Sequence, residues 1–150
     1  MGENMNKSGL NLKNARSKEY FDAMRKIIAD GVCPFCHDFV EKEKPAYHPN
    51  AVQAENDSWV ATRNAWPYNN TKEHLILVVK RHIKTPEEMT EKEMLEFWDI
   101  FKQVKQKLGI THSTFFMRSD STGETGATVQ HLHAQMVVSG GEGPIMTAIG

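Results

Sequence analysis

Residues 126–137 read GATVQHLHAQMV, and this stretch decides the fold of the chain. Its second half alternates polar and apolar residues, which is the pattern of a β-strand whose side chains point alternately to two faces. His131, His133 and Gln135 are therefore predicted to share one face of a strand over residues 129–138, while the residues between them face the core. One face of this strand thus offers three hydrogen-bonding groups in a row.

The segment directly before this strand has the composition of an anion-binding loop. Gly126, Ala127 and Thr128 offer backbone N–H groups and a hydroxyl, and N–H groups that converge in a turn bind anions. Arg118, at the end of the preceding predicted strand, can add a bidentate contact to a phosphate group. The loop and the polar face together indicate a phosphate site. An exposed edge strand that happens to carry two histidines is the plainer explanation of the same pattern.

The rest of the chain predicts two helices and further strands around this one. A helix begins at Ser17 and stops at Gly31, and a longer helix follows the capping box of Thr90 and Glu93 and ends at Gly109. Strands are predicted over residues 59–62, 75–79, 113–117 and 129–138. Strands clustered around one long helix predict an α+β domain with a mainly antiparallel sheet.

Length and charge limit the architecture and the partners. The chain has 150 residues, which suits one domain, and its formal net charge of -1 makes a nucleic-acid partner unfavourable. No apolar run approaches the roughly 20 residues of a membrane helix, and residues 1–16 lack the apolar stretch of a signal peptide. We therefore expect a cytoplasmic protein without a membrane partner. Its domain over residues 17–139 would follow a disordered segment (1–16) and precede a flexible tail (140–150).

The two cysteines, Cys33 and Cys36, are spaced as a CxxC pair. Such a pair supplies half of a tetrahedral metal site, and its CPFC sequence also resembles a glutaredoxin active site. A redox CxxC should follow a core strand and open a helix, whereas here a helix precedes the pair and a charged segment with prolines follows it. A structural metal site is the favoured interpretation, and redox chemistry or two uninvolved cysteines are the alternatives.

The stretch over residues 126–137 resembles the signature of the histidine-triad (HIT) superfamily, in which apolar residues separate polar ones. The third triad position holds Gln135 instead of histidine, which is typical of the branch with galactose-1-phosphate uridylyltransferase and the diadenosine tetraphosphate phosphorylases. Residues 64–67 (NAWP) and 74–82 (HLILVVKRH) are similar to the family's ribose-binding turn and the strand after it. The resemblance covers residues 33–139 and implies a HIT-like fold.

The resemblance implies the catalytic groups. His133, at the middle triad position, would be the nucleophile that attacks the α-phosphate of a nucleotide or dinucleotide, because a neutral imidazole is a competent nucleophile near pH 7. Gln135 would donate a hydrogen bond to a phosphate oxygen. Since glutamine exchanges no proton near pH 7, water attack on the nucleotidyl-histidine intermediate would be poorly assisted. Transfer to phosphate or a sugar phosphate is therefore favoured over hydrolysis.

The resemblance also implies the groups that bind the substrate. Thr128 and the backbone near Gly126 would hold the phosphate, Asn64 would hold the ribose hydroxyls, and His74 would lie near the substrate.

One residue departs from the pattern that the resemblance implies. Asp120 stands where many family members have an amide, and a carboxylate near a phosphate group repels it. Either Arg118 compensates for this charge, or Asp120 points away from the phosphate.

The resemblance gives the cysteine pair two partners. Many HIT proteins, and the uridylyltransferases, bind zinc through such a pair together with a histidine after the apolar strand and the first triad histidine. This implies a structural zinc ion on Cys33, Cys36, His82 and His131. The ion would join the segment around the cysteines to the sheet and fix one end of the strand that carries the nucleophile.

The sequence is compatible with several functions, and it predicts a homodimer. The leading interpretation is a nucleotidyl transferase or phosphorylase that forms a covalent nucleotidyl-histidine intermediate. The alternatives are a slow hydrolase of dinucleoside polyphosphates or nucleoside phosphoramidates and a non-catalytic nucleotide-binding module; an aprataxin-like role at DNA ends is disfavoured by the near-neutral charge. A homodimer is also expected, because the helix over residues 91–108 carries Phe97, Trp98 and Phe101 on a broad apolar surface.

Overall fold

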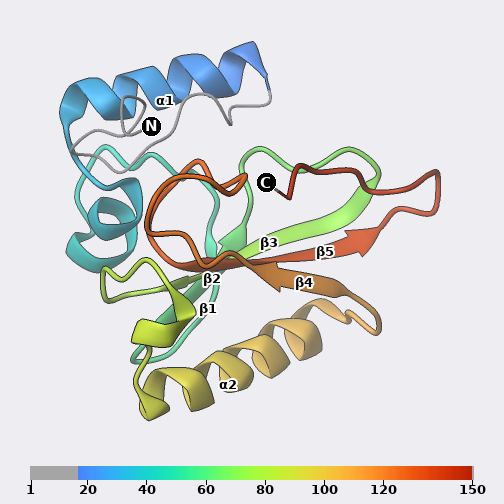
Figure 1. The fold of residues 1–150 in the computed structure, drawn as a ribbon. Helices are drawn as coiled ribbons and strands as arrows, with labels where there is room; N and C mark the ends of the chain where they lie inside the picture. The colour runs from blue at the N-terminus through green and yellow to red at the C-terminus, as the bar shows by residue number, and fades with distance from the viewer. Residues whose placement is uncertain (1–16, 150) are drawn as a thin grey trace.

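A computed structural model describes residues 17–149, in which one five-stranded sheet lies between two helices (Figure 1). The predicted disordered segment over residues 1–16 lies outside the described residues. The elements are α1 (Lys18–Asp30), a π-helical turn η3 (Cys36–Glu41), β1 (Val52–Glu55), β2 (Trp59–Arg63), β3 (Thr71–Val79), a short 3-10 turn η4 (Pro86–Glu88), α2 (Glu91–Leu108), β4 (Thr114–Met117) and β5 (His133–Ser139).

The sheet is antiparallel throughout, with the strand order β1-β2-β3-β5-β4. The apolar strand β3 lies in the centre, paired with β2 on one side and β5 on the other. In this register His133 lies opposite Val78, and Gln135 lies opposite Ile76. The predicted α+β class with an antiparallel sheet is confirmed, and the strand with the polar face lies second from one edge.

Both helices begin and end at the residues that the sequence predicts. The Ser17 hydroxyl caps α1, and Gly31 ends it with a φ of 71°. The side chains of Thr90 and Glu93 form the capping box of α2, which ends at Gly109 with a φ of 64°. Both glycines adopt the left-handed conformation that closes a helix, so these boundaries follow from local chemistry alone.

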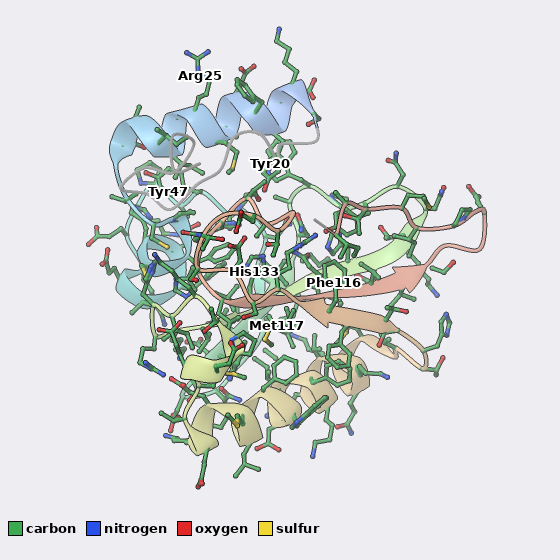
Figure 2. All side chains as sticks on the ribbon, in the orientation of Figure 1. Tyr20, Arg25, Tyr47, Phe116, Met117 and His133 are labelled. Carbon is green, nitrogen blue, oxygen red and sulfur yellow. The ribbon has the colours of Figure 1, made fainter. Side chains whose placement is uncertain are left out.

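The sheet is buried on both faces because its residues alternate between two cores. One face packs against α2, and this core includes Phe97 of the helix together with Trp59, Leu75, Leu77, Leu132, Ala134 and Met136. The opposite face packs against α1 and the segment after it, through Met24, Ile27, Phe35, Phe39, Val60, Ile76 and Val78. Figure 2 shows the same alternation on β4, where Phe116 and Met117 lie on opposite sides of the strand.

The last strand is shorter than predicted. It begins at His133 and not at residue 129. Before it, the backbone leaves the sheet: the N–H of Leu132 donates to the carbonyl of Ile83 at 2.7 Å. The alternation of side chains therefore holds from Leu132 onward, but His131 precedes the strand. Periodicity alone cannot reveal where such a ladder stops.

Two further elements have weak sequence signals. Strand β1 contains Gln, Ala and Glu, which have low strand propensity, and it lies at the edge of the sheet. The π-helical turn over Cys36–Glu41 directly follows the cysteine pair, where the sequence predicts a knuckle and then a loop.

The C-terminal segment folds back along the sheet (Figure 1). Asn70 anchors it, because its carbonyl accepts from the N–H of Gly140 at 2.7 Å and its side chain donates to the carbonyl of Pro144 at 2.9 Å. The flexibility expected of residues 140–150 stays a prediction, but the sequence did not indicate this position. No helix within residues 17–149 is long and apolar enough to cross a membrane.

Candidate active site and metal centre

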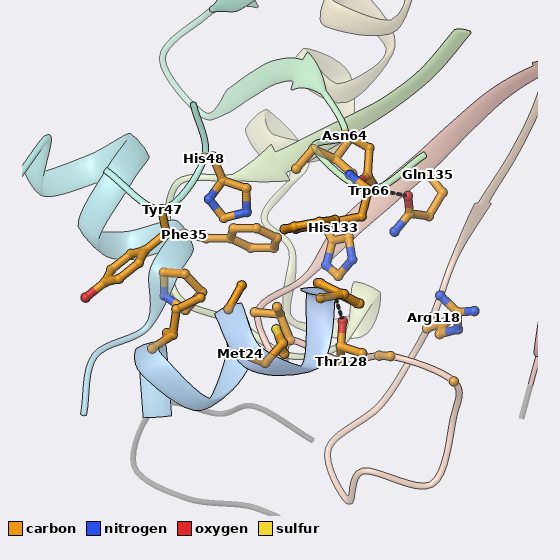
Figure 3. Close-up of a pocket in the computed structure, with 18 of the residues that line it drawn as sticks. Met24, Phe35, Tyr47, His48, Asn64, Trp66, Arg118, Thr128, His133 and Gln135 are labelled. Carbon is orange, nitrogen blue, oxygen red and sulfur yellow. Dashed lines mark hydrogen bonds between the residues drawn. The ribbon is translucent and has the colours of Figure 1, made fainter. Parts of the chain in front are cut away.

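A cavity of about 300 Å³ lies between α1 and the sheet (Figure 3). Its lining includes Tyr20, Met24, Phe35, Trp66, His133 and Gln135. Figure 2 shows Tyr20 on the side of α1 that faces the sheet and Arg25 on the opposite side. The apolar period of α1 is visible in the sequence, but nothing in that period indicates that this face of the helix would cover a cavity.

His133 presents one defined nitrogen to this cavity. Its Nδ1 lies 2.7 Å from the carbonyl oxygen of His131, and a carbonyl can only accept, so Nδ1 carries the proton and Nε2 holds the lone pair. Burial lowers the pKa of His133 to about 4; the hydrogen bond to the carbonyl opposes this shift, and the charge of Arg118 adds to it. His133 is therefore a neutral imidazole with an unprotonated Nε2.

A chain of hydrogen bonds orients Gln135. The backbone N–H of Tyr68 donates to Nδ1 of His74 at 3.0 Å, so Nε2 of His74 carries the proton and donates to Oε1 of Gln135 at 2.6 Å. The side-chain amide of Asn64 also donates to this oxygen, at 3.5 Å. With its oxygen thus engaged, Gln135 has its NH₂ group to donate. His74 is 3% exposed and stands behind Gln135, not on the cavity wall.

Asp120 is turned into its own loop. One carboxylate oxygen accepts from the N–H groups of Thr122 and Gly123, and the other accepts from the N–H and the hydroxyl of Thr125. Burial alone would raise the pKa of Asp120, but these hydrogen bonds lower it overall. Asp120 does not line the large cavity. The sequence left two alternatives for Asp120, compensation by Arg118 or a carboxylate that points away from the phosphate site. The structure has the second.

The predicted phosphate donors contact the C-terminal segment. The Arg118 guanidinium donates to the carbonyl of Ala148 at 2.6 Å, and the N–H of Gly126 donates to the carbonyl of Ile149 at 3.3 Å. A Cβ atom at Gly126 would lie 2.7 Å from the Ala148 oxygen, so this close approach requires glycine. The carbonyl oxygens of Ala148 and Ile149 thus mark the positions at which Arg118 and the N–H of Gly126 each bind an oxygen atom.

Thr128 lies at the same mouth, under α1. Its hydroxyl is 2.5 Å from the hydroxyl of Tyr20, and the Tyr20 ring lies 5.4 Å from the Trp66 ring between centroids. The structure therefore brings the predicted residues Asn64, Arg118, Gly126, Thr128, His133 and Gln135 to one cavity.

Four ligand-bearing side chains meet beside this cavity. Donor atoms of Cys33, Cys36, His82 and His131 lie within 4.8 Å of one another. Nδ1 of His131 is 3.5 Å from both sulfur atoms, while its Nε2 lies 2.5 Å from the Val79 carbonyl. That carbonyl holds the proton on Nε2 and leaves the Nδ1 lone pair toward the sulfurs, as in bound histidine ligands. Two thiols and two imidazoles in this cluster can hold a metal ion.

The pKa values of the two thiols bear on the redox alternative for Cys33 and Cys36. A π-helical turn begins at Cys36, and the charged segment with prolines follows that turn. Burial raises the pKa of Cys33, and burial together with the neighbouring Cys33 raises the pKa of Cys36 to about 12. A redox-active cysteine has a lowered pKa, and these free thiols would have the opposite. The two adjacent histidines favour a metal centre.

A second polar cluster at the cavity was not predicted. Asp38, in η3, accepts at Oδ2 from the N–H and Nδ1 of His48 (2.6 and 2.8 Å) and at Oδ1 from Nδ1 of His37 (2.8 Å) and the N–H of Tyr47 (3.0 Å). The sequence alone assigns no site role to either histidine. A carboxylate ten residues before His48 carries no periodic signal, so only the fold reveals the pair.

Comparison with known proteins places these features in a family. The HIT domain model matches residues 46–139. Similar solved structures include a histidine triad protein from Clostridium difficile, which is 21% identical over 76% of this chain and 95% of that chain, with a TM-score of 0.57. A HIT family hydrolase from Clostridium thermocellum is 23% identical over 76% of this chain and 96% of that chain, with a TM-score of 0.55.

A histidine triad nucleotide-binding protein from Candida albicans also has this fold. It is 12% identical over 77% of this chain and 85% of that chain, with a TM-score of 0.57. At these identities the likeness shows the fold alone. No curated protein matches the chain. The family match begins after the cysteine pair and η3, so these features lie outside the matched range.

Proposed function

This chain belongs to the HIT domain family, and from that premise we propose that it transfers or cleaves a nucleotidyl group through a covalent intermediate on His133. One observation carries the proposal: the hydrogen bond from Nδ1 to the His131 carbonyl at 2.7 Å leaves Nε2 as the lone-pair nitrogen of a residue that lines the cavity. A neutral imidazole with one committed nitrogen is an oriented nucleophile. The solved neighbours include a HIT family hydrolase and a histidine triad nucleotide-binding protein, which supports a nucleotide ligand.

The first chemical step forms the intermediate. Nε2 of His133 attacks the α-phosphorus, a P–N bond forms, and the bond to the leaving-group oxygen breaks, so that its electron pair departs with that oxygen. The NH₂ group of Gln135, held in place by His74, donates to a non-bridging oxygen as charge builds there. Arg118 and the N–H of Gly126, which already converge on oxygen atoms, hold the phosphate.

The second step consumes the intermediate. An acceptor oxygen attacks the same phosphorus, the P–N bond breaks, and the electron pair returns to Nε2 of His133. Water would need a base to remove its proton, but Gln135 cannot serve as one, and His74 has both ring nitrogens engaged. A phosphate or sugar-phosphate acceptor arrives as an anion and needs less assistance. The finer proposal is therefore a transferase or phosphorylase, as in the HxHxQ branch that the sequence resembles.

The metal centre has a structural part in this proposal. Two thiolates and two imidazoles are a donor set that zinc prefers in closed, tetrahedral sites. The ion would supply no chemistry to the reaction beyond a cross-link between the four side chains. Cys33 and Cys36 would thereby be joined to His82 after β3 and to His131, two residues before the nucleophile.

Turnover on a dinucleoside polyphosphate tests the proposal. We expect His133→Ala to lower turnover at least about 1000-fold while nucleotide affinity stays within a few-fold, because the nucleophile acts only in the chemical step. Product analysis by mass at increasing phosphate should show phosphorolysis rising with phosphate concentration. Near-normal turnover by His133→Ala would overturn the mechanism. If only hydrolysis products form at every phosphate concentration, the protein is the slow hydrolase and not a phosphorylase. If nucleotide binds without turnover, the protein is the non-catalytic nucleotide-binding module.

A further inference from the structure

The cavity has two chemically different ends. Figure 3 shows Arg118 and Gln135 at one end, Tyr47 and His48 at the other, and His133 between them. The end near His48 is otherwise apolar, with Ile27, Pro34 and Phe35 on its wall. The hydroxyl of Tyr47 is directed to Asp30, at 2.6 Å. Among the described residues at this end, His48 is therefore the side chain that can offer a polar atom to a ligand.

The His48 ring is fixed in position. Its Nδ1 lies 2.8 Å from Oδ2 of Asp38, whose side chain is 2% exposed. The ring packs against Phe35 and Phe39, with centroid distances of 5.0 and 5.3 Å. Asp38 is held in turn by three further hydrogen bonds from His37 and from the N–H groups of Tyr47 and His48. Neither the ring nor its partner is free to rotate.

This contact decides what the other ring nitrogen can do. A carboxylate oxygen can only accept, so Nδ1 of His48 carries a proton, and in the neutral form of the ring Nε2 holds a lone pair. Nε2 has no hydrogen-bond partner within residues 17–149. An apolar wall with a single oriented acceptor suits a flat ligand that carries one N–H donor at its edge.

We propose that His48 determines nucleobase specificity by accepting a hydrogen bond at Nε2 from the exocyclic amino group of the base. The inference rests on the proposed function, because it requires a nucleotide in this cavity. A base with a keto group at this position would bind less well. Its oxygen would face the lone pair at Nε2 of His48, and both acceptors would then lack a donor in a site away from water. The ligand class is thus a nucleotide with an aminated base, adenine or cytosine, in preference to hypoxanthine or uracil.

The proposal fits the position of the reaction centre. Phe35 contacts both histidines, with ring centroids 5.0 Å from His48 and 5.1 Å from His133. With its phosphate at His133, the nucleotide would place its base against the Phe35 ring, toward His48.

Binding of nucleoside monophosphates to the full chain tests the assignment without turnover. Titration calorimetry would compare two matched pairs, AMP with IMP and CMP with UMP, which differ in an amino or keto group. We expect the amino member of at least one pair to bind about tenfold tighter. Equal affinity within both pairs would overturn the role of His48 and leave the proposed function intact. If none of the four nucleotides binds, the proposed function fails and the assignment fails with it.

Matched asparagine substitutions identify the residue responsible. In His48→Asn the amide NH₂ can replace Nδ1 and keep the hydrogen bond to Asp38, while Nε2 is lost; the affinity ratio should fall to about 1. His37→Asn is the control, since His37 donates to the same carboxylate but does not line the cavity, and its ratio should stay that of the wild type. A ratio that survives His48→Asn would overturn the proposal.

A measurement on the wild type remains decisive if His48→Asn does not fold. The nitrogen chemical shifts of His48 report which ring nitrogen carries the proton. We expect protonated Nδ1, unprotonated Nε2, and a change at Nε2 when AMP or CMP binds. A proton on Nε2 in the free protein would overturn the proposal.

Discussion

Backbone groups assign a different task to each of three histidines. The His131 carbonyl accepts a hydrogen bond from Nδ1 of His133, the Val79 carbonyl accepts one from Nε2 of His131, and the Tyr68 N–H donates to Nδ1 of His74. As a result, His133 offers Nε2 to the cavity, His131 offers Nδ1 to the cysteines, and His74 offers a proton to a neighbouring side chain. In the proposed function, the same kind of side chain would thus serve as a nucleophile, a metal ligand or a positioning group according to its backbone partner.

At the same scale, Asp120 is expected to stabilise its loop in a pH-dependent way. Its pKa is lowered in the folded chain, so its contribution is present above the ordinary carboxyl pKa near 4 and is lost as the pH falls through the lower folded value. Asp120→Ala should reduce the free energy of unfolding by about 2 kcal/mol at pH 7. Denaturant titrations at several pH values should show this difference shrink below about pH 4.

The same loop supplies the control for this prediction. Glu124 is exposed and accepts from the Thr122 hydroxyl at 2.8 Å, and Glu124→Ala should change stability by less than about 0.5 kcal/mol. A difference between wild type and Asp120→Ala that is the same at pH 3 and pH 7 would contradict the account.

The sequence predicts which residues form the site better than it predicts the direction in which their side chains point. His133, Gln135 and the four metal-binding candidates came from spacing and from family resemblance, and the fold brings them together. The direction of Asp120 and the pairing of Asp38 with His48 could not be predicted, because both depend on a loop or turn path that has no periodic signal. Arg118 reached the cavity as predicted, but its contact with the Ala148 carbonyl was invisible to the sequence.

Among the elements, helices were more predictable than strand ends. Caps such as Ser17 and Gly31 act within a few residues, so the sequence contains all the chemistry that sets α1. The start of β5 depends instead on pairing with distant segments: the N–H of Leu132 donates to Ile83, its carbonyl accepts from Val79, and the strand begins at His133. Tertiary contacts decide that boundary, and a single sequence does not display them.

An element-scale prediction concerns the metal centre, which joins η3 to the start of β5. We expect one zinc ion per chain in protein purified without chelator. Removing it should lower the free energy of unfolding by several kcal/mol, less than the roughly 10 kcal/mol of domains that depend wholly on zinc, because two apolar cores remain. Metal analysis and thermal melts with and without chelator would measure this.

Loss of the ligands should reproduce loss of the ion. Cys33→Ser should remove the metal and match the stability of the chelated wild type, whereas Ser58→Ala, at a site away from the cluster, should retain it. Protein that contains no zinc, or a melting temperature that chelator does not change, would contradict the structural role.

At the scale of the whole molecule, the main exposed apolar feature is an aromatic surface on α2 and β4, which no other element within residues 17–149 covers. Trp98 is 48% exposed and Phe115 is 40% exposed, and their rings lie 5.7 Å apart between centroids. Phe115 belongs to β4, the strand at the edge of the sheet. A contiguous apolar patch beside an open strand edge is typical of an association surface.

A homodimer through this surface stays a prediction, as the sequence suggested from α2. Light scattering at micromolar concentration should give twice the mass of one chain, and Trp98→Lys should shift the protein to monomer. Gln103→Lys, exposed on the same helix, should leave the dimer unchanged. A monomeric mass for the wild type would contradict the prediction.

The covalent intermediate on His133 is the central claim for the whole molecule, and intact-protein mass tests it most directly. The protein is mixed with a dinucleoside polyphosphate without added phosphate and stopped within seconds under alkaline denaturing conditions. The account predicts a mass increase of one nucleotidyl group, located by peptide mapping on His133, absent in His133→Ala and discharged by phosphate in the wild type. Turnover by the wild type without any such adduct, or an adduct that persists in His133→Ala, would contradict it.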